Sequence, residues 1–276
     1  MNNLLNSLKD LRRIKLIDEI NEVKLISKKT NGKVYLVNSK YVLKIANKRL
    51  LKIENIFLDY YKKFEKCEKV IYYKEDNEYA LYKFINGHEL NNFDKEECYY
   101  INDILNIINN YKEIHIDGYG NLLNLKEDWI TFLKDEIKAK EYEMKNEELK
   151  KKIVKESIDI LKKYKFEKKF LHGDLGFYNI IYENNILTGI IDPRPIVGDP
   201  IYDYIYCMFS NVNFIKKANI SKIIKLSKEP IEKIKALMYI VLYIRIAIEK
   251  KHKNIDRVKE YENIWNRIKE EEIGNL

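Results

Sequence analysis

Residues 170–179 read FLHGDLGFYN and residues 190–193 read IIDP, and together these two segments are the most informative part of the sequence. Three polar side chains, Asp174, Asn179 and Asp192, flank two apolar runs, and the turn-forming residues between these runs predict a hairpin. Carboxylate and amide oxygens are hard ligands, which suit Mg²⁺ that binds together with phosphates. One carboxylate would then orient an attacking hydroxyl, so the stretch indicates phosphoryl transfer.

The spacing of these residues matches the catalytic loop of protein kinases, His-x-Asp-x-x-x-x-Asn followed by a metal-binding Asp. An isolated Asp174 beside glycines would more often be a turn or helix-cap residue, but the ordered match to Asn179 and Asp192 favours catalysis. His172 is expected to brace the loop. Two departures are present, because Gly173 replaces the kinase Arg and Asp192-Pro193 stands where Asp-Phe-Gly would be.

Upstream of the loop, alternating apolar residues predict a small antiparallel sheet, interrupted by one amphipathic helix. The predicted strands lie at residues 23–26, 33–37, 41–45, 70–73 and 79–84, and the helix runs from about residue 50 to 64. After Gly87 helical patterns dominate, including two C-terminal helices at about residues 231–253 and 256–273. The sequence therefore predicts an α+β protein with a lobe of residues 1–86 and a helical lobe of residues 87–276.

Both departures in the loop resemble the aminoglycoside phosphotransferase and choline kinase family, whose loop reads His-Gly-Asp and is followed by Ile-Asp-(Pro/Trp/Phe). The resemblance covers nearly the whole chain and includes GDPIYD at residues 198–203. It implies a bilobal protein-kinase-like fold, with a small antiparallel-sheet N-lobe that binds the nucleotide and a larger helical C-lobe for catalysis and substrate. ATP and Mg²⁺ are the implied cofactors.

The resemblance also implies roles for single residues. Asp174 would act as the catalytic base, and Asn179 and Asp192 would hold Mg²⁺. The remaining implied nucleotide-binding residues are Lys44 on a strand, its ion-pair partner Glu54 on the amphipathic helix, and Tyr82 and Phe84 in the hinge segment that runs past the adenine. Three alternatives stay open: Lys44 as an outward-facing strand residue, Glu54 as half of a surface i,i+4 pair, and Tyr82 as part of the packing of a hairpin.

The phosphate-covering loop is weak in this sequence, because residues 27–32 contain a single glycine. Backbone amides of Thr30 to Lys33 are expected to contact the β-phosphate nevertheless. No Walker A pattern occurs, which excludes a P-loop enzyme.

Composition argues against several other classes of protein. The formal charge is +8, but Lys and Glu alternate almost everywhere, which is typical of solvated helix faces rather than of a nucleic-acid-binding patch. Cys67, Cys98 and Cys207 have no C-x-x-C spacing, so reduced thiols are expected. The most apolar run, residues 236–248, is too short to span a bilayer and contains Arg245, which predicts a buried helix. We expect a cytoplasmic protein without a signal peptide, nucleic-acid partner, membrane association or obligate protein partner.

The substrate implied by the resemblance is a hydroxylated small molecule. An aminoglycoside-type antibiotic comes first, which would make the protein a resistance enzyme, and choline, ethanolamine, homoserine or thiamine come second. Trp129 and several acidic residues could line a pocket for a cationic substrate or simply form acidic helix faces; the acids are Glu127, Asp128, Glu260, Glu262 and residues 270–272. A catalytically idle pseudokinase is the alternative of another class, and nucleic-acid binding is the third.

Overall fold

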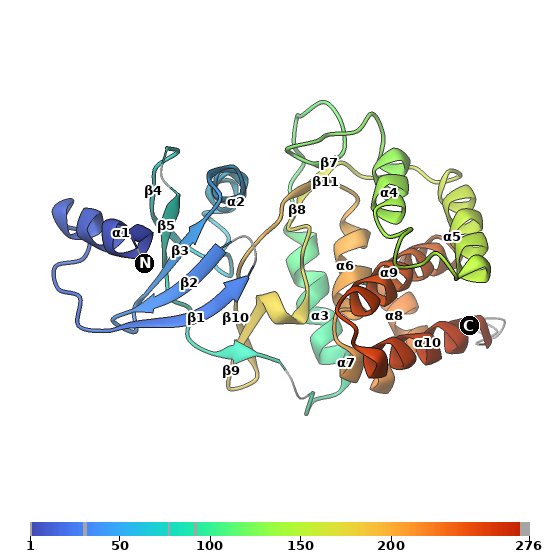
Figure 1. Ribbon diagram of the computed structural model, residues 1–276. Helices are drawn as coiled ribbons and strands as arrows, with labels where there is room; N and C mark the ends of the chain where they lie inside the picture. Colours follow the sequence, from blue (N-terminus) through green and yellow to red (C-terminus); the bar gives the residue numbers. More distant parts are fainter. Residues whose placement is uncertain (1, 30–31, 77, 91–92, 271–276) are drawn as a thin grey trace. The chain divides into compact units, whose positions relative to one another are not determined.

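The computed structural model describes residues 2–29, 32–76, 78–90 and 93–270 (Figure 1). The chain divides into two compact units. The first comprises residues 1–88 and 181–194, and the second comprises residues 89–180 and 195–276. The hairpin after the catalytic loop, which follows the helical pattern in the sequence, is thus grouped with the strand-rich first unit. The boundary expected at residue 86 stays a prediction.

The first unit is built on a five-stranded antiparallel sheet with the strand order β1-β2-β3-β5-β4. Its strands are β1 (Val23–Lys29), β2 (Gly32–Val37), β3 (Tyr41–Ala46), β4 (Val70–Tyr73) and β5 (Tyr79–Lys83). Every strand predicted upstream of the loop overlaps one of these, since each alternating run has one face that can be buried. The antiparallel sheet is confirmed.

Two helices cover this sheet. Helix α1 (Asn2–Arg13) contributes Leu8 and Leu11 to a hydrophobic core shared with Val37, Leu43 and Leu81 of the strands. Helix α2 (Lys48–Tyr60) begins after Asn47, whose side chain accepts a hydrogen bond from the backbone N–H of Arg49 and so satisfies one of the unpaired amides of the first turn. The amphipathic helix predicted at residues 50–64 is thus observed, and it ends one turn earlier.

A short hairpin of β9 (Ile180–Glu183) and β10 (Ile186–Ile190), joined on one side by β6 (His88–Glu89), carries the segment that contains Asp192. Both residues of its turn, Asn184 and Asn185, have positive φ (51° and 60°), as a type I′ turn requires. Backbone bonds tie β10 to the segment before β4, from Ile190 N to the carbonyl of Lys66 (2.7 Å) and from Glu68 N to the carbonyl of Ile190 (3.1 Å). These bonds explain why the hairpin belongs to the first unit.

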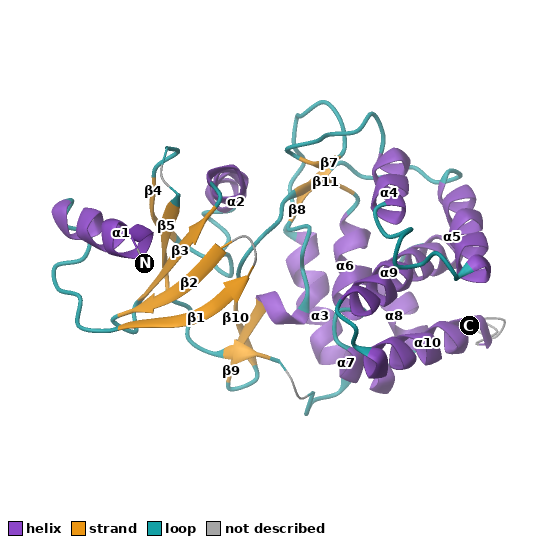
Figure 2. Ribbon diagram, viewed as in Figure 1, coloured by secondary structure: helices purple, strands orange, loops and turns teal. Residues whose placement is uncertain are grey.

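The second unit is mainly helical (Figure 2). Its helices are α3 (Glu97–Asn109), α4 (Trp129–Lys138), α5 (Glu148–Leu161), α6 (Pro200–Met208), α7 (Val212–Lys217), α8 (Ile220–Ser227), α9 (Ile231–Lys251) and α10 (Ile255–Glu270). A small sheet with the order β7-β11-β8 and the 3₁₀ helix η1 (Phe177–Asn179) complete it; the strands are β7 (Gly120–Asn121), β8 (Lys169–Leu171) and β11 (Ile196–Gly198).

Helix α9 is the centre of this unit, since it packs against α4, α5, α6 and α10. The run predicted to be a buried helix lies within α9, and Arg245 in it is only 6% exposed. Among the residues described, no helix is both long and apolar enough to cross a bilayer. The last acidic residues of the chain, at 271 and 272, lie outside the described residues.

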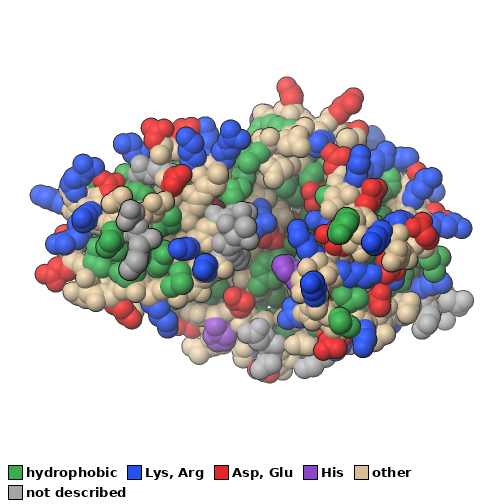
Figure 3. Space-filling view, viewed as in Figure 1, with side chains coloured by type: hydrophobic (Ala, Val, Ile, Leu, Met, Phe, Trp, Pro, Cys, Tyr) green, Lys and Arg blue, Asp and Glu red, His purple; other side chains and the backbone are tan. Residues whose placement is uncertain are grey.

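The surface agrees with the charge pattern of the sequence. On the face drawn in Figure 3, basic and acidic side chains are interspersed rather than segregated. The net positive charge is therefore not gathered into one stripe on this face, which is the feature that nucleic-acid binding would need.

Candidate active site

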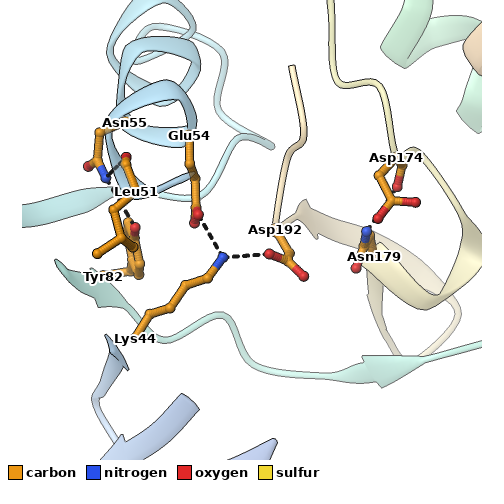
Figure 4. Close-up of polar contacts among 8 residues, drawn as sticks. All are labelled: Lys44, Leu51, Glu54, Asn55, Tyr82, Asp174, Asn179 and Asp192. Carbon is orange, nitrogen blue, oxygen red and sulfur yellow. Dashed lines mark hydrogen bonds and ion pairs between the residues drawn. The ribbon is translucent and has the colours of Figure 1, made fainter. Parts of the chain in front are cut away.

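In the first unit, Lys44 on β3 lies between two carboxylates that come from distant parts of the sequence. Its Nζ is 2.6 Å from Oε2 of Glu54 on α2 and 2.5 Å from Oδ1 of Asp192 after β10 (Figure 4). The structure therefore brings three predicted site residues together. Lys44 does not point into solvent, and Glu54, 3% exposed, is not half of a surface pair.

Burial and charge compete in this cluster. Burial works to lower the pKa of Lys44, but the charges of Glu54 and Asp192 outweigh it and raise that pKa above its usual range. Burial likewise raises the pKa of Glu54, against the opposing effect of Lys44. With one ammonium between two carboxylates, the ionised cluster is net negative and suited to accept a further cation.

Helix α2 fixes Glu54 by burying the face on which it lies. Leu51, Phe57 and Leu58 are at most 2% exposed, and Asn55 donates a hydrogen bond to the hydroxyl of Tyr82 (3.2 Å). The phenol of Tyr82, predicted to lie at the nucleotide, is thus buried in the packing of β5 against α2 (Figure 4).

The hinge residue Phe84 follows β5, and its backbone N–H donates to the carbonyl of Lys40 (2.9 Å). No adenine contact of Tyr82 or Phe84 can be derived from these bonds. Their nucleotide-binding roles stay predictions.

Asp192 has a φ of 56°, in the left-handed region that residues other than glycine rarely adopt. Burial raises the pKa of the nearby Glu68 to about 8, and the negative charges of Glu54 and Asp192 act in the same direction. Glu68 was missed by the sequence analysis, because a single Glu between lysines carries no signal.

The predicted phosphate loop is described only in part, since residues 30–31 lie outside the described residues. Gly32 begins β2, where a Cβ atom would lie 2.7 Å from the carbonyl oxygen of Ile45. Gly32 is therefore required by the close pairing of β2 and β3. The expected amide contacts of Thr30 to Lys33 with a phosphate stay a prediction.

In the second unit, Asp174 lies between β8 and η1 with 9% of its surface exposed. Its Oδ1 accepts hydrogen bonds from the hydroxyls of Tyr178 (2.6 Å) and Tyr206 (3.0 Å). Nδ2 of Asn179 donates to the backbone carbonyl of Asp174 (2.9 Å), which leaves the Asn179 amide oxygen as the atom suited to a metal. The structure thus brings Asp174 and Asn179 together as the five-residue spacing predicted.

Asp203 on α6 fixes the backbone of the catalytic loop. Asp203 Oδ2 accepts hydrogen bonds from Gly173 N (3.1 Å) and from the hydroxyl of Tyr111 (2.8 Å), and burial raises the pKa of Asp203 to about 7. Gly173 has a φ of 76°, so the arginine of protein kinases would be strained there. His172 is fully buried and its Nδ1 accepts the backbone N–H of Asp174 (3.4 Å), which agrees with the expected bracing role.

Three residues around Asp174 were missed by the sequence analysis. Tyr178 and Tyr206 bond to its carboxylate, and Arg245 on α9 lies over the ring of Tyr206 at 4.0 Å. Tyr178 stands at a variable position of the motif, so its type had no assigned meaning. The only available signal for Arg245 was a single charge inside an apolar run.

The donor set fits Mg²⁺ rather than a metal held by the protein alone. No group of three or more His, Cys, Asp or Glu side chains that could hold a metal occurs in the part of the chain that the structure describes. Asn179 and Asp192 offer oxygen atoms, the ligands that Mg²⁺ prefers when phosphates and waters complete its shell.

The sequence matches the family model described as "Phosphotransferase enzyme family" over residues 22–218. No curated protein sequence matches. Among solved structures, the chain is similar to the GDP complex of wild-type aminoglycoside 2'-phosphotransferase-IIIa (TM-score 0.63, 13% identity, 98% of this chain and 99% of that one covered).

Two other solved structures are similar over most of their length. One is the streptomycin–ATP–APH(2")-IIa ternary complex (TM-score 0.60, 17% identity, 92% and 95% covered). The other is a thermostable mutant of APH(4)-Ia with AMP-PNP and hygromycin B (TM-score 0.62, 14% identity, 94% and 96% covered). At these identities the likeness concerns the fold, and it confirms the predicted kinase-like α+β fold.

Proposed function

The chain belongs to the phosphotransferase enzyme family, and on this premise we propose that it transfers the γ-phosphate of ATP to a hydroxyl group of a small molecule. The match covers well over half of the chain and both strand-rich and helical segments. Family membership confirms the predicted enzyme class, a phosphotransferase.

The observation that carries the proposal is the position of Lys44 between Glu54 and Asp192. In kinases a strand lysine paired with a helix glutamate binds the phosphates, and a following Asp binds the metal. Lys44 is largely buried and contacts a carboxylate from a helix and another from a distant loop. These contacts are not those of an ordinary surface lysine. The sequence also argues against a catalytically idle pseudokinase, because it retains the full set of expected site residues: Lys44, Asp174, Asn179 and Asp192.

In the proposed reaction, Asp174 accepts the proton of the substrate hydroxyl and orients its oxygen toward the γ-phosphorus. Lys44 Nζ contacts the α- and β-phosphates and is held in place by Glu54. Asn179 and Asp192 would hold Mg²⁺, which when bound neutralises charge on the phosphates. The O–H bond of the substrate breaks and an O–P bond forms, while ADP leaves with the bridging oxygen.

For the substrate we propose an aminoglycoside-type antibiotic, and hence a role in antibiotic resistance. The support is that several structures of similar fold are named as aminoglycoside phosphotransferases, some in complex with streptomycin or hygromycin B. Choline, ethanolamine, homoserine and thiamine are the outcomes to test against it. We further propose that the enzyme acts in the cytoplasm, where its free cysteines stay reduced.

The test is ATP turnover by the purified protein with Mg²⁺ against a panel of aminoglycosides, choline, ethanolamine, homoserine and thiamine, with GTP as an alternative donor. Stimulation by an aminoglycoside, with phosphate found on the antibiotic by mass spectrometry, is the expected result. Stimulation by one of the metabolites alone would replace the substrate class. Absence of any Mg²⁺-dependent nucleotide binding would contradict the proposed kinase function.

A further inference from the structure

Two tyrosines bind the carboxylate of Asp174: Tyr178, 4 residues later in the sequence, and Tyr206, 32 residues later. Tyr178 OH and Tyr206 OH converge on the same oxygen, Oδ1, at 2.6 and 3.0 Å, and the two hydroxyls lie 3.2 Å from each other. A phenol keeps its proton at neutral pH, so both hydroxyls can donate a hydrogen bond to the carboxylate.

Behind the tyrosines lies a buried cation. The guanidinium carbon of Arg245 is 4.0 Å from the ring centre of Tyr206 and 5.8 Å from that of Tyr178, and Arg245 is 6% exposed. Its Nη2 donates a hydrogen bond to the backbone carbonyl of Tyr206 (3.4 Å). Within the described part of the chain, Arg245 makes no ion pair with a carboxylate, and its buried Nε has no hydrogen-bond partner.

A buried arginine without an ion-pair partner is costly, so such an arrangement is retained only where the fold or the chemistry needs it. Here the guanidinium lies against the rings of Tyr206 and Tyr178, whose hydroxyls both donate to Asp174. A cation beside a phenol polarises its O–H bond in the low-dielectric interior. A polarised phenol is a stronger donor than an isolated one, and two such donors on one oxygen fix the orientation of the carboxylate.

We propose that Tyr178, Tyr206 and Arg245 are positioning residues that hold the Asp174 carboxylate in the orientation from which it meets the substrate hydroxyl. The proposal rests on the proposed kinase function. It assigns to Tyr178 the main share, because Tyr178 makes the shorter hydrogen bond to Asp174. Tyr206 acts as a second donor to the same oxygen and as the platform on which the guanidinium lies.

The test compares Tyr178→Phe and Tyr206→Phe with Tyr204→Phe. Tyr204 is a matched control, because it lies on α6 beside Tyr206, is fully buried and donates its hydroxyl hydrogen bond to the carbonyl of Ile223 (2.8 Å), away from Asp174. We expect kcat to fall roughly 10- to 100-fold in Tyr178→Phe and less in Tyr206→Phe, as for the loss of a hydrogen bond to a charged group. The KM for ATP should be unchanged in both, and kcat should be unchanged in Tyr204→Phe.

Arg245 is tested by its own pair of variants. Arg245→Met should lower kcat, and Arg245→Lys should restore part of it, since the ammonium keeps the positive charge beside the phenols. Equal losses of kcat in Tyr204→Phe and Tyr178→Phe would reduce the network to a packing role and overturn the proposal. So would a Tyr178→Phe enzyme with kcat within twofold of the wild type.

A measurement without substrate separates this proposal from the kinase function. The hydroxyl proton of Tyr178 should give a slowly exchanging, downfield NMR signal that is lost in Tyr178→Phe and shifted in Asp174→Asn. If that signal is present but no substrate is phosphorylated, the network stands and the proposed function fails. If turnover is normal and the signal is absent or insensitive to Asp174→Asn, the network fails and the function stands.

Discussion

The two carboxylates of the candidate site are held in opposite ways in the two units. In the first unit, Asp192 forms an ion pair with Lys44, a cation that Glu54 also contacts. In the second unit, the neutral hydroxyls of Tyr178 and Tyr206 donate hydrogen bonds to Asp174, and Arg245 lies over the ring of Tyr206.

The difference follows from what each carboxylate is proposed to do. A residue that shares a metal ion and phosphates tolerates a direct salt bridge, because incoming charges rearrange the cluster on binding. A base must accept a proton from a hydroxyl, and a lysine in direct contact would stabilise its charged form too strongly for that task. Neutral hydrogen bonds fix its orientation at a smaller effect on its proton affinity.

The largest effect should come from the residue held by neutral donors. Asp174→Asn keeps the shape and one oxygen acceptor but cannot accept a proton, so kcat should fall roughly 1,000-fold or more. Binding of ATP, measured by calorimetry, should stay within about threefold of the wild type, because Asp174 does not take part in the Lys44 cluster. Full turnover by Asp174→Asn would show that the base is assigned to the wrong residue.

Asp203, which bonds to the catalytic loop, should make the stability of the protein depend on pH. Burial raises the pKa of Asp203 to about 7, well above the usual range of a carboxyl group, so the folded protein holds this proton where the unfolded chain has lost it. The unfolding free energy should therefore decrease as pH rises from about 4 to 7, by up to about 4 kcal/mol. Asp203→Asn keeps the acceptor for Gly173 N and should lack this component.

Urea unfolding at a series of pH values measures it, with the difference between wild type and Asp203→Asn isolating the one group. Other titrating groups are common to both proteins and cancel in that difference. A difference that is flat between pH 4 and 7 would mean that Asp203 is already ionised in the folded protein.

A change in the ion-paired cluster of Lys44, Glu54 and Asp192 should lower activity less than Asp174→Asn does, and should lower nucleotide affinity more. Lys44→Met leaves Glu54 and Asp192 without their common partner and removes a phosphate contact, so kcat/KM for ATP should fall roughly 100-fold, about 2.7 kcal/mol. The matched variant Lys83→Met, on exposed β5 surface, should leave kcat/KM unchanged. Steady-state kinetics at varied ATP decide between them, and equal values for the two variants would remove Lys44 from the site.

Much of the fold could be predicted from the sequence because its strands alternate cleanly and its turns carry recognisable residues. Asn184 and Asn185 predicted the hairpin turn, and both have the positive φ that the turn needs. The order of Asp174, Asn179 and Asp192 indicated a catalytic loop, since that chemistry depends on spacing along one segment. Gly173 is likewise explained by backbone conformation alone.

The parts that could not be predicted depend on contacts between distant segments. Arg245 lies over the ring of Tyr206 because α9 packs against α6, and Glu68 lies near Asp192 because β10 bonds to the segment before β4. Tyr82 shows the same limit, since its segment resembles a hinge that runs past the adenine, while only the structure shows that its phenol is buried against α2. A segment resemblance places a backbone, but it does not say which way a side chain points.

The smallest effect should come from the helix side of the ion-paired half. Glu54→Gln keeps an oxygen acceptor for Lys44 but removes one negative charge, and burial already disfavours that charge. We therefore expect kcat/KM for ATP to fall only roughly tenfold, with thermal stability unchanged or slightly raised. Glu54→Ala is the contrasting variant, because it leaves Lys44 with Asp192 alone, and it should cost more in both measurements. If Glu54→Gln lowers kcat/KM for ATP as much as Lys44→Met does, then the charge of Glu54 is required and not only its position.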